Sequence, residues 1–394
     1  MKKSIKDYNY NEKKVILRCD LNVPMKNNII EDDTRIKQSL KTINYLIENN
    51  AKVIILSHLG KIKEESDLEK NNLYPVSIRL GELLNKEVIF IDETRGEKLE
   101  SAVNNLKPKE VLLVQNTRYE DLYDNKESNC DSELSKYWAS LGDIFINDAY
   151  ATLHRSHASN VGIAKYLPSA VGFLIEEELN KIDNFLNKEE HPFTVIMGGA
   201  KVKDKIKLIE NLINKCDKLI IGGLMAYTFL YASEIKVGKT QIDEESIDFC
   251  KEMLIKHKDK IILPIDSLVS TDINSNNYEN KFITDINSDE LALDIGEETI
   301  KLYKEELKDS KKILINGPLG YFEKEIYANG TKEVFNYIAE NNILCLVGGG
   351  DSASAVNKLC DPQKFYHIST GGGATLKYLE GTKLAGLESI NDID

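Results

Sequence analysis

Short apolar runs recur through the first half of the chain, and each has the length and apolar character of a buried strand. They are Val15–Leu17, Lys52–Leu56, Glu87–Ile91, Val111–Val114 and Asp143–Ile146. Amphipathic stretches lie between them. After Asp32 and Asp33, one of which we expect to cap a helix, apolar residues at positions 36, 40, 43 and 47 form one helical stripe. This alternation predicts parallel strands connected by helices, as in an α/β fold.

The second half repeats the alternation, and most of its strands end in glycine-rich turns. Strands are predicted at Phe193–Ile196, Leu219–Ile221, Ile261–Asp266, Lys312–Ile315 and Ile343–Val347, with a last strand beginning at Tyr366. Between the two sets of strands, residues 174–186 have the apolar stripe of a single amphipathic helix. A chain of 394 residues also exceeds what one hydrophobic core usually serves. We therefore expect two domains with this helix as their connector.

The stretch at the midpoint of the chain combines a strand, paired glycines and a helix. Gly198 and Gly199 follow the strand Phe193–Ile196, and the apolar pattern then becomes helical through Ile213. If the helix has begun by Lys201, then Lys201 and Lys205 share one face at its N-terminal end, where free N–H groups attract phosphate. The alternative is a solvated lysine face.

Polar clusters follow the strands of the first half, and several contain arginine or histidine. Asp20 and Asn22, His58, Arg118, and the His154–His157 segment all come directly after predicted strands. Because the carboxyl ends of adjacent parallel strands line one crevice, these groups should converge. The sequence thus predicts a basic site for a small molecule that carries phosphate and carboxylate. For His154 and His157 a role as core or loop histidines is the alternative.

Charge and composition narrow the class of protein. With 51 Lys+Arg against 64 Asp+Glu, the net charge of −13 argues against a general nucleic-acid or acidic-membrane partner. The six cysteines are scattered without a C-x-x-C pair, which favours reduced thiols. No apolar stretch reaches the roughly 20 residues of a membrane span, and the N-terminus lacks an apolar signal region. A cytoplasmic location is expected.

Arginine is scarce, and its positions carry information. The arginines are Arg18, Arg35, Arg79, Arg95, Arg118 and Arg155, and the chain beyond Arg155 has none. Where composition favours lysine, a retained arginine marks a place that needs a planar fork for carboxylate or phosphate. Arg35 fits this hypothesis, since the first turn of a helix is electrostatically unfavourable for a cation. Arg18 and Arg79 are expected to be ordinary.

Two other nucleotide-binding classes are disfavoured by their motifs. Gly348-x-Gly350-x-x-Ala353 after a strand matches a relaxed dinucleotide-binding fingerprint. That fingerprint requires an acidic residue at the end of the next strand, and this strand ends in Ser369-Thr-Gly-Gly instead. A nicotinamide-dependent dehydrogenase is thus a minor alternative. A P-loop NTPase is disfavoured because no G-x-x-x-x-G-K-[ST] is present.

Taken together, these motifs resemble those of the phosphoglycerate kinase family from about Val15 to Gly386. The blocks are Asp20-Leu-Asn-Val-Pro, His58-Leu-Gly, Asn147-Asp-Ala, His154-Arg-x-His-Ala-Ser, Gly198-Gly-Ala-Lys-Val-x-Asp-Lys, Asn316-Gly-Pro-x-Gly-x-Phe-Glu, Gly348-Gly-Gly-Asp-Ser and Ser369-Thr-Gly-Gly-Gly-Ala. The resemblance implies two Rossmann-like three-layer α/β/α domains with parallel sheets that face a cleft. The phosphoglycerate-binding domain would comprise residues 1–170 and the C-terminal tail 383–394, the connector helix 171–190, and the nucleotide-binding domain 191–382.

The family resemblance also implies a reaction and a set of site residues. The reaction is reversible transfer between ATP and 3-phosphoglycerate, giving ADP and 1,3-bisphosphoglycerate, with Mg²⁺ accompanying the nucleotide and a monomeric enzyme. The phosphoglycerate ligands would be Asp20, Leu21, Asn22, Arg35, His58, Leu59, Gly60, Lys61, Arg118 and Arg155. The nucleotide ligands would be Lys201, Lys205, Gly222, Glu323, Gly349, Gly350, Asp351 and Ser352, with Asp351 holding the metal. Arg35, Lys201 and backbone N–H groups at Gly350 and Gly373 would stabilise the phosphoryl group in flight.

The sequence also departs from the family pattern. Lys61 and Ile62 stand where arginine and proline usually follow His-Leu-Gly, and Gln115 replaces the more frequent glutamate. Leu224 and Ala292 each replace a usual glycine and are expected to border the adenine and ribose pocket. Leu224 could narrow that pocket, or it could turn into the adjacent core. A catalytically silent binding protein on the same fold is the alternative to a working kinase.

Overall fold

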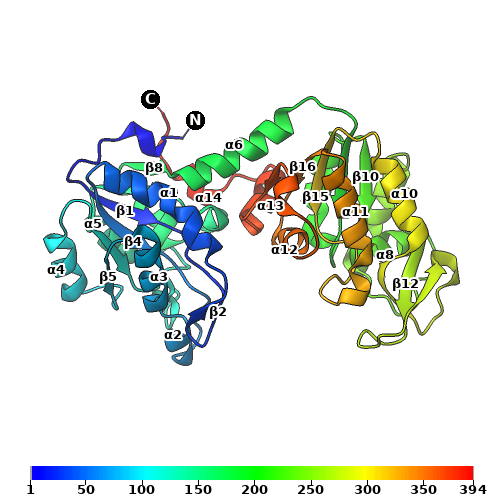
Figure 1. The fold of residues 1–394 in the computed structure, drawn as a ribbon, viewed down its shortest axis with the longest axis horizontal. Helices are drawn as coiled ribbons and strands as arrows, with labels where there is room; N and C mark the ends of the chain where they lie inside the picture. The colour runs from blue at the N-terminus through cyan, green and yellow to red at the C-terminus, as the bar shows by residue number, and fades with distance from the viewer. Residues whose placement is uncertain (1, 394) are drawn as a thin grey trace. The chain divides into compact units, whose positions relative to one another are not determined.

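The computed structural model describes residues 2–393, which divide into two compact units. One comprises residues 2–180 together with 383–393, and the other residues 181–382. The helix α6 (Phe173–Asn187) carries the chain from the first unit into the second (Figure 1). No helix among the described residues is long and apolar enough to cross a membrane.

The first unit is built on a parallel sheet of six strands in the order β5-β6-β4-β1-β7-β8. Its strands are β1 (Lys14–Arg18), β4 (Lys52–Leu56), β5 (Val88–Ile91), β6 (Val111–Val114), β7 (Ile144–Asn147) and β8 (Ser169–Val171). Its helices are α1 (Thr34–Glu48), α2 (Ser66–Lys70), α3 (Tyr74–Leu84), α4 (Glu97–Asn105), α5 (Ser132–Ser140) and α14 (Ala385–Glu388), and a short hairpin joins β2 (Met25–Lys26) to β3 (Ile29–Ile30). One hydrophobic core lies where α1 and α3 pack on the strands β1, β4 and β6.

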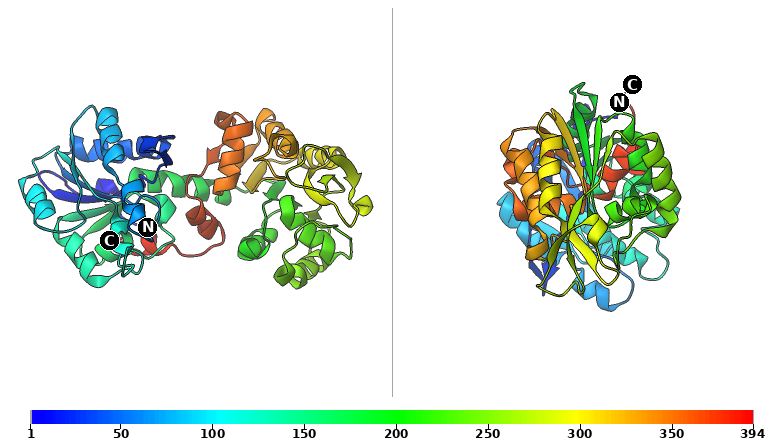
Figure 2. Two further views of the ribbon diagram at one scale, coloured as in Figure 1. Left: turned by 90° about the horizontal axis from the view of Figure 1, so that it is seen from below. Right: turned by 90° about the vertical axis from the view of Figure 1, so that its right-hand side faces the viewer.

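The second unit repeats this design with a six-stranded parallel sheet in the order β11-β10-β9-β15-β16-β17. The strands are β9 (Phe193–Met197), β10 (Lys218–Ile221), β11 (Ile261–Ile262), β15 (Lys312–Asn316), β16 (Leu344–Val347) and β17 (His367–Ile368). The helices are α7 (Ile206–Ile213), α8 (Gly223–Ala232), α9 (Ile247–Lys256), α10 (Glu297–Leu307), α11 (Asn329–Glu340), α12 (Gly350–Leu359) and α13 (Gly373–Leu379). The right-hand view of Figure 2 shows yellow and orange helices on one side of this sheet and green helices on the other. The predicted α/β class with parallel sheets is confirmed.

One predicted strand was wrong, because the segment 261–266 is two strands in two sheets. β11 ends at Ile262, and Pro264, which has no N–H to donate to a ladder, separates it from β12 (Asp266–Ser270). β12 pairs antiparallel with β13 (Glu279–Phe282) and β14 (Leu291–Ile295). This three-stranded sheet was not predicted.

Asp32 and Asp33 have different roles at the N-terminus of α1. Asp33 occupies the N-cap position, but its side chain accepts no capping hydrogen bond. Asp32 Oδ1 instead accepts hydrogen bonds from the backbone N–H of Thr34 at 2.8 Å and from its hydroxyl at 2.6 Å. Asp33 pairs with Arg79, whose Nη2 lies 2.8 Å from Asp33 Oδ2. Arg79 is thus an ordinary ion-pairing arginine, as expected.

The C-terminal tail lies against the first unit through backbone hydrogen bonds. Gly386 N–H donates to the Leu153 carbonyl at 2.8 Å, and Lys3 N–H donates to the Asn391 carbonyl at 2.8 Å. The side chain of Asn391 accepts a hydrogen bond from Ser169 N–H at 2.7 Å. The tail therefore lies beside β8 and the N-terminal segment that pairs with β8.

A buried carboxyl group at the start of α6 gives the first unit a pH-dependent stability. Asp148 Oδ1 accepts the N–H groups of Leu174 and Ile175 at 2.9 and 3.3 Å, whereas Oδ2 has no hydrogen-bond partner. Burial raises the pKa of Asp148 from 3.8 to about 7, although the nearby Thr42 side chain and the two N–H groups oppose the shift. Because the folded protein binds this proton more tightly, stability should be greatest below pH 3.8 for this group and should decline until pH passes about 7.

We therefore expect Asp148→Asn to flatten the fall in the free energy of unfolding between about pH 4 and pH 7. Asparagine retains one oxygen for the two N–H groups and cannot ionise. Urea unfolding of wild type and variant at a series of pH values measures the effect. Parallel pH dependences of the two proteins would show that Asp148 does not carry the proton.

Candidate functional site

Four neighbouring strand ends bring the predicted basic groups of the first unit together. The sheet order β6-β4-β1-β7 places the segments after these strands side by side, and they carry Arg118, His58, Asp20 and Arg155 in that order. Burial lowers the pKa of His58 well below its usual value, and the nearby charges of Arg18, Arg118 and Arg155 lower it further. The imidazole is therefore neutral among cations.

Asp20 and Asn22 hold this cluster in place. Arg35 Nη1 contacts Asp20 Oδ2 at 2.5 Å, and the Asp20 carboxylate is 6% exposed. Asp20 Oδ1 accepts the N–H of Asn22 at 3.2 Å, and Asn22 Oδ1 accepts the N–H of Gly60 at 2.8 Å. Arg35 is thus anchored from its own helix α1 to the end of β1. The guanidinium group of Arg35 is therefore held in place by Asp20, while part of the Arg35 side chain remains accessible to solvent.

Arg118 and Arg155 complete the cluster with donors available for an anion. Arg118 is 8% exposed, and its Nη1 donates to the Gly60 carbonyl at 3.3 Å, whereas its Nε has no hydrogen-bond partner. Burial lowers the pKa of Arg155, the positive charge of Arg118 lowers it further, and Asp20 opposes both. Arg118 and Arg155 thus repel each other in a partly buried place. An anion of high charge would relieve this repulsion, so the arrangement favours binding of such an anion.

The sequence analysis missed the residue that shapes the loop after β4. Asn116 is fully buried, and its Nδ2 donates to the carbonyls of Leu59 and Asn71 at 2.7 and 2.9 Å. Its Oδ1 accepts the N–H groups of Leu59 and Arg118 at 3.1 and 3.0 Å. The sequence signal that could have identified Asn116 is its position directly after β6, between Gln115 and Thr117.

Other predicted residues of this group differ in what they can offer. The side chains of Leu21 and Leu59 are buried in the hydrophobic core, so only their backbone atoms can face a ligand. Gly60 has φ +58°, and a Cβ there would lie 2.1 Å from Asn71 Oδ1, which explains the glycine. Lys61 is exposed. Gln115 is buried, and its Oε1 accepts the N–H groups of Leu73 and Asn116, so this departure serves the local fold.

The expectation for Lys205 was wrong in one respect. The helix α7 begins only at Ile206, so Lys201 and Lys205 do not share a helical face. Lys205 Nζ donates instead to the carbonyls of Gly198 and Asn316 at 2.7 Å each and to Asn316 Oδ1 at 2.5 Å. Burial lowers its pKa to about 8, opposed by Asp351 and Asp204. Lys205 therefore joins the ends of β9 and β15, while Lys201 is exposed in the loop before it.

The glycine turns of the second unit approach one another too closely for side chains. A Cβ on Gly198 would lie 1.9 Å from the Pro318 carbonyl oxygen. Gly223, with φ +63°, would place a Cβ 2.6 Å from the backbone nitrogen of Gly199. Ser352 is buried and accepts the N–H of Gly317 at 2.6 Å. The loops after β9, β10 and β15 are thus packed backbone to backbone, and the Ser352 side chain joins α12 to the turn after β15.

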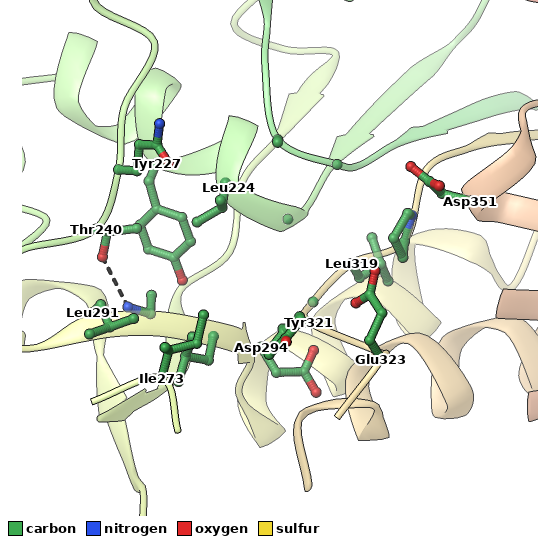
Figure 3. A pocket seen from close by; sticks show the side chains of 18 of the residues that line it. Leu224, Tyr227, Thr240, Ile273, Leu291, Asp294, Leu319, Tyr321, Glu323 and Asp351 are labelled. Atoms are coloured by element: carbon green, nitrogen blue, oxygen red, sulfur yellow. Dashed lines mark hydrogen bonds between the residues drawn. The ribbon is translucent and has the colours of Figure 1, made fainter. Parts of the chain in front are cut away.

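A cavity of about 320 Å³ opens beside these turns, with one apolar and one acidic end. Figure 3 shows Leu224, Tyr227, Leu291 and Ile273 at one end and Glu323 and Asp351 at the other. Leu224 therefore faces the cavity and is only partly buried. Ala292 also lines it, and its N–H donates to Thr240 Oγ1 at 3.0 Å, the bond drawn in Figure 3. This is a volume and polarity suited to a ring system at one end and a charged, metal-binding group at the other.

The predicted residues of the second unit fall into three groups around this cavity. Glu323 and Asp351 line it with exposed carboxylates. Gly222, Gly349, Gly350, Ser352 and Lys205 shape the neighbouring turns, and α12 begins at Gly350. Lys201 and Gly373 do not line the cavity, although Gly199 and Ala200, next to Lys201, do. Asp294, which no motif singled out, lies on its wall, and burial raises its pKa to about 8.

Arg18 was also misjudged, because it is not an ordinary arginine. It is fully buried beneath the basic cluster, and its Nη2 lies 3.2 Å from His58 Nδ1. Its Nε donates to Ser159 Oγ at 2.8 Å. Burial lowers the pKa of Arg18, and the negative charge of Glu127, which is also fully buried, is the strongest influence that opposes this shift, followed by that of Asp20.

Comparison with known proteins identifies the fold and the family. The family model described as phosphoglycerate kinase matches residues 5–382. The phosphoglycerate kinase of Macrococcus caseolyticus is 50% identical over 394 residues and that of Fusobacterium nucleatum 49% over 397, and both alignments cover 100% of each chain. A solved phosphoglycerate kinase from Coxiella burnetii has a TM-score of 0.87 and 35% identity, covering 99% of this chain and 98% of that one. One from Pyrococcus horikoshii has a TM-score of 0.85 and 32% identity, with 98% of each chain covered.

These comparisons decide between the functional alternatives left open by the motifs. A full-length match across both units favours the kinase over the nicotinamide-dependent dehydrogenase and over a catalytically silent relative. The two sites described above lie in the two units that the match spans. The chain belongs to the phosphoglycerate kinase family, whose members are phosphotransferases.

Proposed function

We propose that this chain catalyses the reversible transfer of a phosphoryl group between ATP and the carboxylate of 3-phosphoglycerate, giving ADP and 1,3-bisphosphoglycerate. As a member of its family it is a kinase of glycolysis. The observation that carries the assignment of the substrate site is the convergence of His58, Arg118 and Arg155 at adjacent strand ends, where Arg35 joins them from α1 through its ion pair with Asp20. A compact substrate that carries both phosphate and carboxylate matches such a cluster.

In this proposal the basic cluster binds phosphoglycerate. Arg118 and Arg155 face its phosphate, because two guanidinium forks neutralise a dianion in a partly buried place. Asp20 and Asn22 orient the loop of Gly60 and the hydroxyl end of the substrate. His58 donates a hydrogen bond as a neutral imidazole, since its pKa is held below the physiological range by burial and by its arginine neighbours.

The cavity of the second unit then holds the nucleotide. The apolar end, with Leu224, Tyr227 and Leu291, accommodates the purine, and Glu323 accepts the ribose hydroxyls. The phosphates extend toward the turns at Gly199 and Gly349 and the N-terminus of α12, where backbone N–H groups and the helix dipole favour anions. Lys205 supports these turns from below through its bonds to Gly198 and Asn316.

The residues around Asp351 suit a magnesium ion that arrives with the nucleotide. The described residues contain no cluster of three or more His, Cys, Asp or Glu that could cage a metal. Mg²⁺ in phosphotransferases is typically held by one or two carboxylates together with substrate phosphates and water, and a single exposed carboxylate at a helix start fits that mode. The ion would neutralise phosphate charge during transfer.

Transfer itself requires positioning and neutralisation rather than a covalent intermediate. The carboxylate oxygen of phosphoglycerate and the β-phosphate oxygen must lie in line, and the equatorial oxygens of the phosphoryl group must meet positive charge. Arg35, Lys201 and the N–H groups at Gly350 and Gly373 supply that charge in this proposal. Because the two sites belong to different units, we propose that α6 acts as a hinge and that the units close over both substrates. Small-angle scattering that shows no compaction with both ligands would contradict this closure.

The remaining proposals concern the setting of the enzyme. We propose a monomer in the cytoplasm, without nucleic-acid or membrane partners. The net charge of −13 supports the absence of polyanionic partners. All six cysteines lie among the described residues as free thiols, in accord with a reducing compartment.

Turnover in a coupled assay with ATP, Mg²⁺ and 3-phosphoglycerate tests the proposed function. Activity should vanish with excess EDTA and return with added Mg²⁺, because the free nucleotide lacks charge neutralisation. An inert protein that still binds both substrates by calorimetry would establish the catalytically silent alternative.

Leu224 offers a separate test of the nucleotide site. We expect Leu224→Ala to weaken binding of ATP about fivefold, because a partly buried apolar contact of about 1 kcal/mol is lost at the purine end. Calorimetric Kd values for ATP measure the change. Tyr231→Ala is the matched control, since Tyr231 lies on the same helix α8 but is 46% exposed and outside the cavity. Equal Kd values for the Leu224 variant and wild type would remove Leu224 from the site.

A further inference from the structure

Three buried residues behind His58 form a chain of hydrogen bonds whose directions can all be assigned. Glu127 Oε1 accepts the hydroxyl proton of Ser159, and Glu127 Oε2 accepts the N–H of Ser159 at 2.9 Å. Since that hydroxyl has given its only proton to Glu127, its oxygen is an acceptor for Arg18 Nε–H at 2.8 Å. Glu127, Ser159 and Arg18 are each fully buried. We call these three residues the relay.

The last bond of the relay determines which nitrogen of His58 carries the proton. Arg18 Nη2 lies 3.2 Å from His58 Nδ1. An arginine side chain has donors only and keeps its proton, so Nδ1 must present a lone pair. The proton of the neutral ring therefore resides on Nε2. A protonated ring is also disfavoured, because a second N–H at Nδ1 would point at the guanidinium.

The surroundings of His58 contain other charged groups, and they act in the same direction. Arg118 and Arg155 are cations on the same cluster, and His157 is a further basic neighbour, whose own pKa is lowered to about 3 by burial and the same arginines. His157 Nδ1 lies 3.8 Å from Glu127 Oε1, which is too long for a hydrogen bond. Among the described residues, the relay is thus the only chain of hydrogen bonds that connects the Glu127 side chain with His58.

We infer that Glu127, Ser159 and Arg18 are positioning residues that hold His58 as a neutral Nε2–H tautomer, so that it meets the substrate as a hydrogen-bond donor. Glu127 compensates the buried charge of Arg18, and Ser159 fixes the guanidinium plane by receiving Nε–H. The role in substrate binding rests on the proposed function, but the tautomer of His58 does not. None of the three needs to touch the substrate.

The first test reads the tautomer directly in the whole protein without ligands. The ring nitrogens of ¹⁵N-histidine-labelled protein are followed by two-bond ¹H–¹⁵N correlation spectra between about pH 5 and pH 8, where an unperturbed histidine titrates. His58 should show an unprotonated Nδ1 and a protonated Nε2 throughout. A His58 that titrates in this range, or that carries its proton on Nδ1, would overturn the inference. His58→Gln identifies its signals.

Ser159→Ala breaks the relay without removing a charge. We expect His58 to become a mixture of tautomers, because Arg18 Nε loses its acceptor and the guanidinium is no longer fixed. Ser77→Ala is the matched control, since Ser77 is also a buried serine of this unit but donates to the Tyr74 carbonyl on α3, outside the relay. If the two variants give the same His58 spectrum as wild type, the relay does not set the tautomer. Arg18→Met provides a second variant, in which His58 should also become a mixture of tautomers, because no donor then holds Nδ1 as an acceptor.

Kinetics distinguish a positioning role from general damage to the fold. In Ser159→Ala the KM for 3-phosphoglycerate should rise about three- to tenfold, the cost of one weakened hydrogen bond, with a smaller change in kcat. That KM should also become dependent on pH, whereas loss of folded protein would lower activity equally at every substrate concentration. A proportional loss without a KM change would contradict the positioning role. If the wild-type protein shows no turnover although His58 carries its proton on Nε2, the proposed function is wrong, but the inference about the relay still holds.

Discussion

Lys201→Ala is expected to lower kcat by about two to three orders of magnitude while the Kd values of ATP and 3-phosphoglycerate stay within about threefold. Lys201 is exposed in the loop after Gly199 and Ala200, and its side chain makes no hydrogen bond or ion pair with the described residues. Its loss should therefore disturb neither the fold nor the empty site. The positive charge of Lys201 should act mainly in the transition state, where it stabilises the negative charge on the equatorial oxygens of the phosphoryl group.

The matched control is Lys203→Ala in the same loop. Lys203 Nζ pairs with Glu245 Oε2 at 2.9 Å on the surface, so its removal should cost little. Both variants are compared with wild type in the coupled assay, with Kd values from calorimetry. A fall in affinity that accounts for the whole loss of activity in Lys201→Ala would show that this lysine binds the ground state rather than the transition state.

Arg35→Ala extends the same prediction to the first unit. A similar fall in kcat is expected, together with some loss of phosphoglycerate affinity, because the buried carboxylate of Asp20 loses its ion-pair partner. Lys37→Ala on the same helix is the control, since its Nζ pairs with Asp33 Oδ1 at 2.8 Å and is exposed. If the Arg35 and Lys37 variants had equal kcat, the charge-stabilising role of Arg35 would be wrong.

Gly198→Ala is expected to destabilise the second unit by more than about 3 kcal/mol, beyond the usual cost of overpacking. The added Cβ would lie 1.9 Å from the Pro318 carbonyl oxygen and 2.7 Å from its carbon, and backbone cannot move aside as a flexible side chain can. Displacing Pro318 would also separate Gly198 from Lys205 and deform the cavity that Pro318 lines. Binding of ATP should therefore be lost along with stability.

Gly350→Ala provides a control for substitution in a glycine turn. A Cβ at Gly350 would meet nothing within 4 Å, and its φ is not in the left-handed region. Its stability should therefore equal or slightly exceed that of wild type, because alanine favours a helix start more than glycine does. Urea unfolding monitored by circular dichroism compares the two variants. A Gly198→Ala protein as stable as Gly350→Ala would show that the turn after β9 can relax.

Much of the fold could be predicted because its signals are local. A buried strand must be apolar over a few consecutive residues, and a helix such as α3 or α6 must repeat its apolar positions with helical spacing. Both patterns can be read without knowing what the element packs against. The order of the elements then predicts parallel sheets, and the ends of parallel strands indicate where polar ligand-binding groups gather.

The errors came from interactions between residues far apart in the sequence. Nothing near Lys205 indicates that its ammonium group would bind Asn316, 111 positions away. Pro264 indicated a break in the predicted strand. The antiparallel partners of β12, which are β13 and β14, could not be predicted because a loop separates each of them from the preceding strand. The buried hydrogen-bond partner of Arg18 is Ser159, which lies 141 positions later in the sequence.

The sequence by itself therefore determined the class of fold, the two sets of strands, and which polar residues stand at strand ends. Only the tertiary structure decided what those residues do. It placed Leu21 and Leu59 in the core, turned Leu224 toward the cavity, and linked Glu127 through Ser159 and Arg18 to His58. The physical reason is that periodicity and propensity act over a few residues, whereas burial, charge compensation and hydrogen-bond direction depend on neighbours that chain folding alone brings together.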